Sequence, residues 1–187
     1  MNADIKATLL HEQDIADAVK KLGKKISNDY AGKELMLVSV LKGSVVFMAD
    51  LMRAITIPAS IDFMAVSSYG SGAKTSGVVK IIKDLDVELA GKHILIVEDI
   101  LDSGMTLSYL KEHITSKGAA SIKIATLLDK PERRCVDVKA DYRCFEVPDE
   151  FVVGYGLDYN EKYRNLPYVG VLKSEIYQSA DSMAGRK

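Results

Sequence analysis

One stretch near the middle of the chain joins an apolar run, a set of carboxylates and the start of a helix. Residues 94–97 are all apolar and are followed at once by Glu98 and Asp99. A polar loop at 102–106 comes next, and apolar residues then recur at helical spacing from residue 107. The pattern predicts a buried strand that leads through a loop into a helix. Ligands bind at such strand ends in open α/β sheets, and a helix N-terminus attracts phosphate.

Strands and helices alternate along the rest of the chain. The hydrophobic pattern predicts strands at 35–41, 61–66, 78–82, 94–97, 122–128, 151–155 and 168–172, and helices at 15–26, 45–55 and 107–117. This alternation is typical of an α/β fold with a mostly parallel sheet and helices on both faces. Strands 61–66 and 78–82 would form a long hairpin around the glycine-containing loop 67–77.

Size and composition limit the classes of protein to consider. The 187 residues predict one domain, 1–187, with room for a small subdomain, and 48% hydrophobic residues suffice for a substantial core. A net charge of −1 predicts no overall attraction to nucleic acid or membrane. Cys135 and Cys144 fit no zinc motif and are expected to be reduced thiols. With no signal-peptide pattern and no membrane-length apolar run, we expect a soluble cytoplasmic protein.

The loop 102–106 has two readings when taken alone. The hydroxyls of Ser103 and Thr106, with backbone N–H groups of the loop, would hold a phosphate, and Gly104 would let the backbone approach it closely. Asp, Ser and Thr are also common at helix N-caps without a ligand, and for the loop alone the plain N-cap is favoured. The apolar strand and acidic pair immediately upstream favour the phosphate site.

Glu98 and Asp99 are adjacent and would point to opposite faces of a regular strand. They can share a site only where the strand is ending. There they would accept hydrogen bonds from sugar hydroxyls or hold Mg²⁺, which prefers carboxylate oxygens. A solvated strand end is the alternative, although it explains one carboxylate more easily than two behind four apolar residues.

The segment 94–106 resembles the signature of the phosphoribosyltransferases, which use phosphoribosyl pyrophosphate. Nearly the whole chain resembles their bacterial hypoxanthine-guanine branch. The resemblance implies the type I phosphoribosyltransferase fold: a twisted, mostly parallel sheet flanked by helices. It also implies a small hood formed by the N-terminal helix and the segment after about residue 148.

The same resemblance implies an activity in purine salvage. The phosphoribosyl group of phosphoribosyl pyrophosphate would be transferred to N9 of hypoxanthine or guanine, with Mg²⁺, to give IMP or GMP and pyrophosphate. Members of the branch form dimers and tetramers, so a homo-oligomer is expected.

Asp102 and Lys130 would act on the purine base by this resemblance. Asp102 would be the general base that handles the proton on N7, a type of help typically worth about 10²–10⁴-fold. Lys130 would donate to the exocyclic O6, and adenine, which carries a donor there, would be rejected. Without the family resemblance, Asp102 can also be interpreted as a helix cap. For Lys130, a surface position and a role in base binding then carry about the same weight.

The resemblance also names residues around the pyrophosphate. The backbone and side chains of Lys42, Gly43 and Arg164 would bind it, often with a non-proline cis peptide between residues 41 and 42. Ser68 and Tyr69 would close over it as a lid that excludes water. Met105 would complete the phosphate loop. Taken alone, Lys42-Gly43 is a plain turn and Arg164 a surface charge.

The stretch 151–159 resembles the purine-binding segment of the branch. Phe151 would stack on the base, and the backbone of Val152 would read its N1 and exocyclic edge. Asp158 would help hold a second Mg²⁺ through waters or lie near the base. On the residues alone, 151–155 is a core strand and Asp158 a turn residue.

Three other classes of protein share parts of this pattern. A regulatory protein of the same fold would bind phosphoribosyl pyrophosphate or RNA, but it would be expected to carry a basic stripe. A phosphoacceptor signalling domain would carry an acidic pair after its first strand, which is missing here. Members of the adenine and orotate branches would keep a segment like 98–106. They would not be expected to carry Asp129-Lys130 together with the 151–158 segment in this form.

Overall fold

The computed structural model describes residues 2–68 and 79–178. The expected lid residue Tyr69 lies outside this part, and Ser68 is described through its backbone alone. The proposed lid therefore stays a prediction from the sequence.

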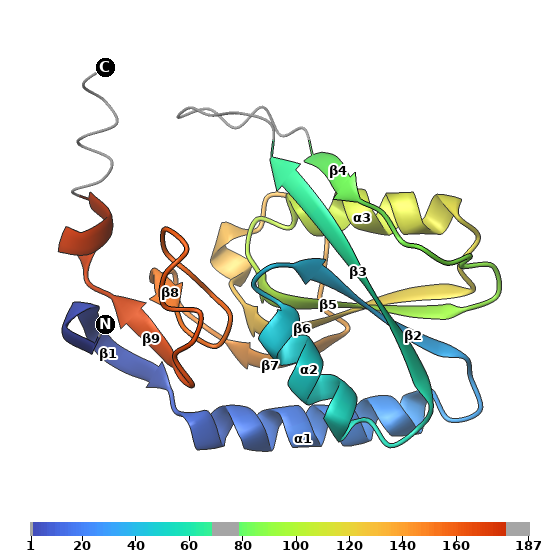
Figure 1. Cartoon of the computed structure of the whole chain (residues 1–187), viewed down its shortest axis with the longest axis horizontal. Helices are drawn as coiled ribbons and strands as arrows, with labels where there is room; N and C mark the ends of the chain where they lie inside the picture. Colours follow the sequence, from blue (N-terminus) through green and yellow to red (C-terminus); the bar gives the residue numbers. More distant parts are fainter. Residues whose placement is uncertain (1, 69–78, 179–187) are drawn as a thin grey trace.

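A six-stranded sheet forms the centre of the molecule (Figure 1). Its strands are β2 (Leu35–Leu41), β3 (Ala59–Ser68), β4 (Val79–Lys83), β5 (His93–Leu101), β6 (Ser121–Asp129) and β7 (Tyr142–Glu146), in the spatial order β4-β3-β2-β5-β6-β7. β4 pairs antiparallel with β3, as the predicted hairpin requires, and the other neighbours are parallel. α2 (Val45–Ala54) lies in the crossover from β2 to β3 and α3 (Met105–Ser116) in that from β5 to β6, while α1 (Glu12–Asp29) precedes β2, so both faces of the sheet are covered.

The two faces of the sheet are packed by different helices. α1 (Glu12–Asp29) and α2 (Val45–Ala54) share one core with Leu35 and Leu37 of β2, whereas α3 (Met105–Ser116) shares the other with Met36 and Val38. Alternate residues of one strand thus enter opposite cores, which explains its unbroken apolar run. α1 and α2 pack closely at Gly23. A Cβ placed on this glycine would lie 2.6 Å from Cβ of Ala54, so a larger residue would not fit.

A second, three-stranded antiparallel sheet lies beside the first (Figure 1). Its order is β1 (Ile5–Leu10), β9 (Val169–Leu172) and β8 (Val152–Val153), and the short 3₁₀ turn η1 (Asn2–Asp4) precedes it. The N-terminal contribution to this sheet is a strand, while α1 packs against α2 and β7 of the main body.

Most predicted elements are confirmed, with differences at particular strands. β2 has the predicted bounds, and α3 ends as expected before Gly118, whose φ is +81°. β5 was predicted to end at residue 97, but it continues to Leu101 because Glu98 and Ile100 still pair with β6. β8 keeps two of the five predicted residues, since left-handed backbone at 154–156 ends it. β1 and β7 were not predicted.

Candidate active site

The predicted site residues gather at one edge of the main sheet. β2, β5 and β6 are parallel neighbours, so their carboxyl ends meet there. The loop after β2 carries Lys42 and Gly43, the end of β5 carries the acidic pair, and Lys130 follows β6. In the described part of the chain, no helix has the length and apolar character to cross a membrane.

Asp99 lies directly against the loop after β2. A Cβ placed on Gly43 would be 1.8 Å from Oδ2 of Asp99 and 3.6 Å from Nη1 of Arg164. Residue 43 must therefore be glycine if this carboxylate is to stay in place. The peptide bond between Leu41 and Lys42 is cis, which confirms the geometry implied by the family resemblance.

Arg164 ties the loop that follows β8 to this point. Its guanidinium donates to the carbonyl of Gly156 at 2.8 Å and forms an ion pair with Asp158 at 2.9 Å. Glu161 lies 3.4 Å from Arg164 and 3.1 Å from Nζ of Lys42. Three predicted residues, Lys42, Asp158 and Arg164, are thus brought into one charged cluster beside Asp99.

The acidic pair at the end of β5 is poorly compensated. Burial raises the pKa of Glu98 well above its usual value, and the charge of Asp99 raises it further. Oε2 of Glu98 is buried and has no hydrogen-bond partner in the described structure. Burial also raises the pKa of Asp99 to about 6, despite hydrogen bonds from backbone N–H groups and the charge of Arg164. Two such carboxylates are suited to meet a cation or hydroxyl donors that arrive with a ligand.

The phosphate loop begins α3 in the way the sequence predicted. Gly104 is the N-cap, with a φ of +83°, and has no side chain to satisfy the N–H groups of the first turn. Oγ of Ser103 accepts a long hydrogen bond of 3.4 Å from the N–H of Met105. Thr106 follows within the first turn. The first-turn N–H groups and two hydroxyls thus lie within five residues, as an anion site requires.

Lys130 follows β6 and lies beside the end of β5. The backbone N–H of Lys130 donates to the carbonyl of Leu101, so the end of β5 and the turn after β6 are held together. Lys130 is 5% exposed, and its Nζ donates to the carbonyl of Glu150 at 2.6 Å. Burial lowers the pKa of Lys130, while the charges of Asp102 and Asp149 oppose this change.

Phe151 and Val152 continue from this contact. The Phe151 side chain is 37% exposed and stacks on Tyr177, with ring centroids 4.9 Å apart. Tyr159 meets its ring edge-on at 5.5 Å. Val152 is buried in β8. An exposed aromatic ring beside Lys130 is suited to stack on a planar ligand.

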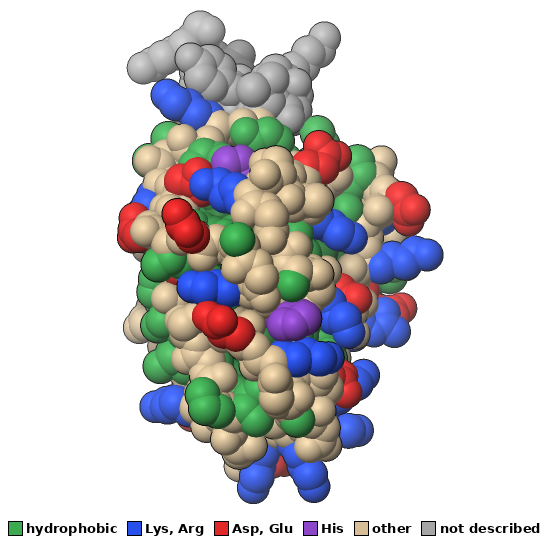
Figure 2. All heavy atoms as spheres, turned by 90° about the vertical axis from the view of Figure 1, so that its right-hand side faces the viewer, with side chains coloured by type: hydrophobic (Ala, Val, Ile, Leu, Met, Phe, Trp, Pro, Cys, Tyr) green, Lys and Arg blue, Asp and Glu red, His purple; other side chains and the backbone are tan. Residues whose placement is uncertain are grey.

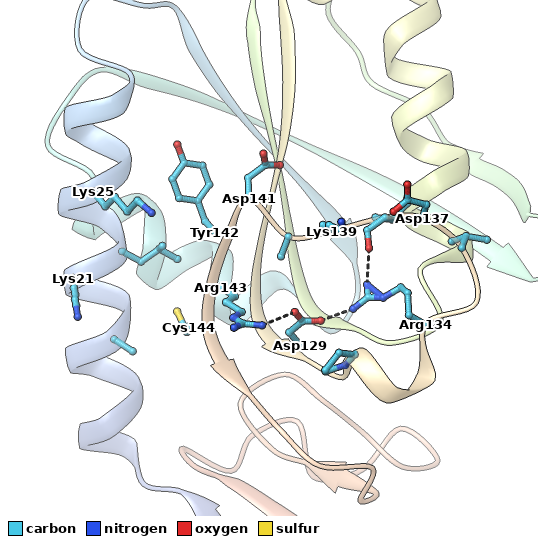
Figure 3. Close-up of a pocket in the computed structure, with 16 residues that line it drawn as sticks. Lys21, Lys25, Asp129, Arg134, Asp137, Lys139, Asp141, Tyr142, Arg143 and Cys144 are labelled. Carbon is cyan, nitrogen blue, oxygen red and sulfur yellow. Dashed lines mark hydrogen bonds and ion pairs between the residues drawn. The ribbon is translucent and has the colours of Figure 1, made fainter.

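Asp129, the residue before Lys130, is fixed by two arginines (Figure 3). Arg134 forms an ion pair with its Oδ1, and Arg143 lies 3.3 Å from its Oδ2. Arg134 also donates to the carbonyls of Leu101 and Val138. A cavity of about 830 Å³ lies between this group and α1, and neither Asp102 nor Lys130 lines it. The candidate site at the strand ends is therefore separate from this cavity.

Comparison with known proteins identifies the family. The model of the phosphoribosyl transferase domain matches residues 6–160. The chain belongs to the phosphoribosyltransferase family. This phosphoribosyltransferase is 55% identical to the hypoxanthine-guanine phosphoribosyltransferase of Streptococcus thermophilus over 177 residues, 95% of this chain and 98% of the relative.

Solved structures agree with that assignment. A hypoxanthine phosphoribosyltransferase from Staphylococcus aureus is 52% identical, with a TM-score of 0.92 over 95% of this chain and 96% of the other. A variant of the Trypanosoma cruzi enzyme in a ternary substrates complex is 41% identical, with a TM-score of 0.88 over 94% and 99%. The type I phosphoribosyltransferase fold expected from the sequence is thereby confirmed.

Several residues of this phosphoribosyltransferase site were not predicted from the sequence. Glu161 joins Lys42 to Arg164, and Arg133 joins Asp102 to Asp149. Glu161 lies three residues from both Asp158 and Arg164, a spacing that was available as a signal for local ion pairs. No sequence pattern relates Arg133 to Asp102, which lies in a different loop. Among residues 2–68 and 79–178, no three His, Cys, Asp or Glu side chains converge as a metal cage.

Proposed function

We propose that this phosphoribosyltransferase transfers the phosphoribosyl group of phosphoribosyl pyrophosphate to N9 of hypoxanthine or guanine. The products are IMP or GMP and pyrophosphate. The observation that carries the proposal is the juxtaposition of two clusters at one sheet edge: the Asp99–Gly43–Arg164 group and the Asp102–Lys130 group. The names of its relatives support the same reaction.

The phosphoribosyl pyrophosphate would extend along the edge between these clusters. Its 5′-phosphate would lie at the N-terminus of α3, held by the 103–106 loop. Its ribose hydroxyls would face Glu98 and Asp99, whose charges the surrounding residues compensate poorly. Lys42, Gly43 and Arg164 would contact the pyrophosphate, because Arg binds phosphate oxygens in a bidentate manner.

The purine would occupy the space beside Lys130. Nζ of Lys130 would donate to O6, Phe151 would stack on the ring and the Val152 backbone would read its edge. In the reaction, the N9 lone pair forms the bond to C1′ while the bond from C1′ to pyrophosphate breaks, and pyrophosphate leaves with the electron pair. Asp102 then holds the proton released from N7.

Mg²⁺ fits the donors on the pyrophosphate side. It is usually bound by one or two carboxylates together with substrate phosphates, so a cage of three protein ligands is not required. Glu98, Asp99 and Asp158 would hold it directly or through waters, and the buried Oε2 of Glu98, which has no hydrogen-bond partner among the described residues, is available as a ligand. When bound, Mg²⁺ neutralises charge on the departing pyrophosphate.

The proposal is tested by offering separate bases with Mg²⁺ and phosphoribosyl pyrophosphate. Hypoxanthine, guanine, xanthine, adenine, uracil and orotate are supplied one at a time, and nucleotide and pyrophosphate are followed. We expect turnover with hypoxanthine and guanine and none with adenine. Binding of phosphoribosyl pyrophosphate without turnover of any base would refute the enzyme reading and favour a regulatory protein.

We propose further that residues 1–187 form one domain that works in the cytoplasm as a homo-oligomer, with the β1-β9-β8 sheet as its hood. Acidic and basic side chains are interspersed over much of the face in Figure 2, so this face does not carry the continuous basic stripe expected of a nucleic-acid-binding surface. Val45 and Met52 of α2 and Ile61 of β3 are exposed, and such apolar residues suit a subunit contact. Light scattering tests this, since a species of 20.5 kDa would contradict it.

A further inference from the structure

Arg133 connects the two groups proposed to act on the purine. Its Nε lies 3.3 Å from Oδ1 of Asp102, and its Nη1 lies 3.5 Å from Oδ1 of Asp149. The same oxygen of Asp149 lies 3.9 Å from Nζ of Lys130. One guanidinium therefore reaches from the proposed general base to the carboxylate that faces the proposed O6 donor.

The backbone around Arg133 is well held. It ends the 3₁₀ turn η2 (Pro131–Arg133), and its N–H donates to the carbonyl of Lys130 at 3.2 Å. Lys130 in turn donates to the carbonyl of Glu150. The turn after β6 thus contacts both the phosphate loop and the 149–150 segment that leads into Phe151.

The contact with Asp102 selects one of its two oxygens. Oδ1 of Asp102 is buried and accepts no well-aligned hydrogen bond from the described residues, so the guanidinium is the charged group that faces it. The Asp102 side chain as a whole is 40% exposed, which leaves Oδ2 as the accessible oxygen. An arginine on Oδ1 restricts rotation of the carboxylate and directs Oδ2 to the site.

A purely stabilising role does not account for this arrangement. The side chains of Arg133 and Asp149 are 51% and 49% exposed. Ion pairs this exposed contribute little to folding stability, because water screens them and two long side chains lose freedom. Positioning a reacting group is a different matter, since small misplacements cost large factors in rate.

We propose that Arg133 is a positioning residue that orients Asp102 toward N7 of the purine and links this carboxylate through Asp149 to Lys130. The proposal rests on the function assigned above to Asp102. Arg133 itself contacts no reacting atom. It acts by holding Oδ1, so that Oδ2 receives the N7 proton while the bond from N9 to C1′ forms.

Kinetics of single and double variants test the proposal. We expect Arg133→Ala to lower kcat with hypoxanthine by about 10–100-fold, with KM for phosphoribosyl pyrophosphate within about twofold. Arg133→Lys should restore part of the rate, since a cation returns without the planar fork. In an Asp102→Asn background, Arg133→Ala should cost nothing more, because both changes remove one interaction.

A matched control separates this effect from general loss of a surface ion pair. Arg53→Ala removes an exposed arginine that pairs with Asp50 on α2, away from the strand ends, and should leave kcat unchanged. Thermal melting of each variant checks folding. If Arg133→Ala does not fold, Arg133→Gln serves instead, since it keeps the aliphatic stem and loses the charge.

The outcomes are distinct. Unchanged kcat in Arg133→Ala, or losses that multiply with those of Asp102→Asn, would overturn the role of Arg133 while the enzyme reading stands. A wild-type protein that turns over no purine would instead refute the proposed function. A rise in KM for phosphoribosyl pyrophosphate with unchanged kcat would also overturn the proposal, because it would place Arg133 on the other substrate.

Discussion

Asp62 of β3 and Asp99 of β5 are carboxylates in strands of the same sheet, but their surroundings differ sharply. Asp62 accepts N–H groups of Phe63 at 2.7 Å and Asp86 at 2.8 Å, and Lys83 lies 3.4 Å away. Burial alone would raise the pKa of Asp62, but these partners outweigh it and the pKa is lowered. For Asp99 burial prevails, and the pKa is raised to about 6.

The difference separates a carboxylate that stabilises the fold from one that we propose to bind a ligand. Asp62 stabilises the base of the β3–β4 hairpin, where Lys83 forms ion pairs with both Asp62 and Asp86. Asp99 and its neighbour Glu98 are more weakly compensated, because burial outweighs the backbone N–H groups and Arg164 at Asp99, and Oε2 of Glu98 has no hydrogen-bond partner among the described residues. Sites of binding and catalysis are where such costs are retained, because a ligand recovers them.

The largest expected effect is at the third carboxylate, Asp102. Asp102→Asn should lower turnover by about 10²–10⁴-fold, because the acceptor for the N7 proton is lost. Binding of phosphoribosyl pyrophosphate, measured by calorimetry, should persist, since Asp102 lies on the purine side. Unchanged turnover would remove Asp102 from its proposed role.

Lys130→Gln should produce the next largest change. The charged donor to O6 is lost, and a hydrogen bond from a charged group is worth about 1.5–3 kcal/mol, so kcat/KM for hypoxanthine should fall by roughly 10–100-fold. Steady-state kinetics with hypoxanthine, guanine and adenine measure this. Lys139→Gln, at an exposed lysine of the following loop, is the control. An unaltered base preference would show that Lys130 does not read O6.

Replacing Asp99 and Asp62 by Asn should change the stability of the protein in opposite directions. Asp99→Asn removes a poorly compensated buried charge and should raise Tm of the free protein by roughly 2–5 °C. Asp62→Asn removes a well-bonded carboxylate and should lower Tm by a similar amount. Melting by circular dichroism decides the signs. Asp99→Asn should also weaken binding of phosphoribosyl pyrophosphate with Mg²⁺, whereas Asp62→Asn should not. If Tm shifts in the same direction in both variants, the two carboxylates do not differ in compensation as described.

The smallest effect concerns Asp84, which joins the strand edge to α3. Burial alone would raise the pKa of Asp84, but Lys117 at 2.8 Å, the N–H of Leu85 and His113 at 3.0 Å lower it to about 2. Because the pKa of Asp84 is lowered in the folded protein, its ionised form stabilises the fold at any pH above the ordinary pKa of 3.8. This stabilisation is lost as the pH falls toward 2.

Asp84→Asn should therefore lower Tm at pH 7 by about 1–3 °C, a modest amount because the group is partly exposed. The gap from wild type should close between about pH 4 and pH 2. Melting curves across this range measure it, with Glu88→Gln, an exposed carboxylate of the same segment, as control. A gap that persists at pH 2 would show that the ion pairs are not its source.

Local pattern was enough to predict the strand, loop and helix of residues 94–106. Hydrophobic periodicity and helix-start residues depend on neighbours in sequence, so β2 and α3 were found nearly to the residue. β1 and β7, each of which joins a sheet edge, were missed. A strand of this kind is defined by its partner more than by its own composition.

The sequence by itself determined the α/β class and the order of strand, loop and helix around residues 102–106, and through family resemblance it predicted the phosphate site and the reaction. Only the tertiary structure decided which charges meet. Lys42 and Glu161 are 119 residues apart, and Arg133 reaches Asp102 from the end of a different strand. It also decided that Asp62 is well compensated and Asp99 poorly, although both are aspartates in apolar strands. Compensation of a buried charge depends on the atoms that surround it in space, and those come from distant parts of the chain.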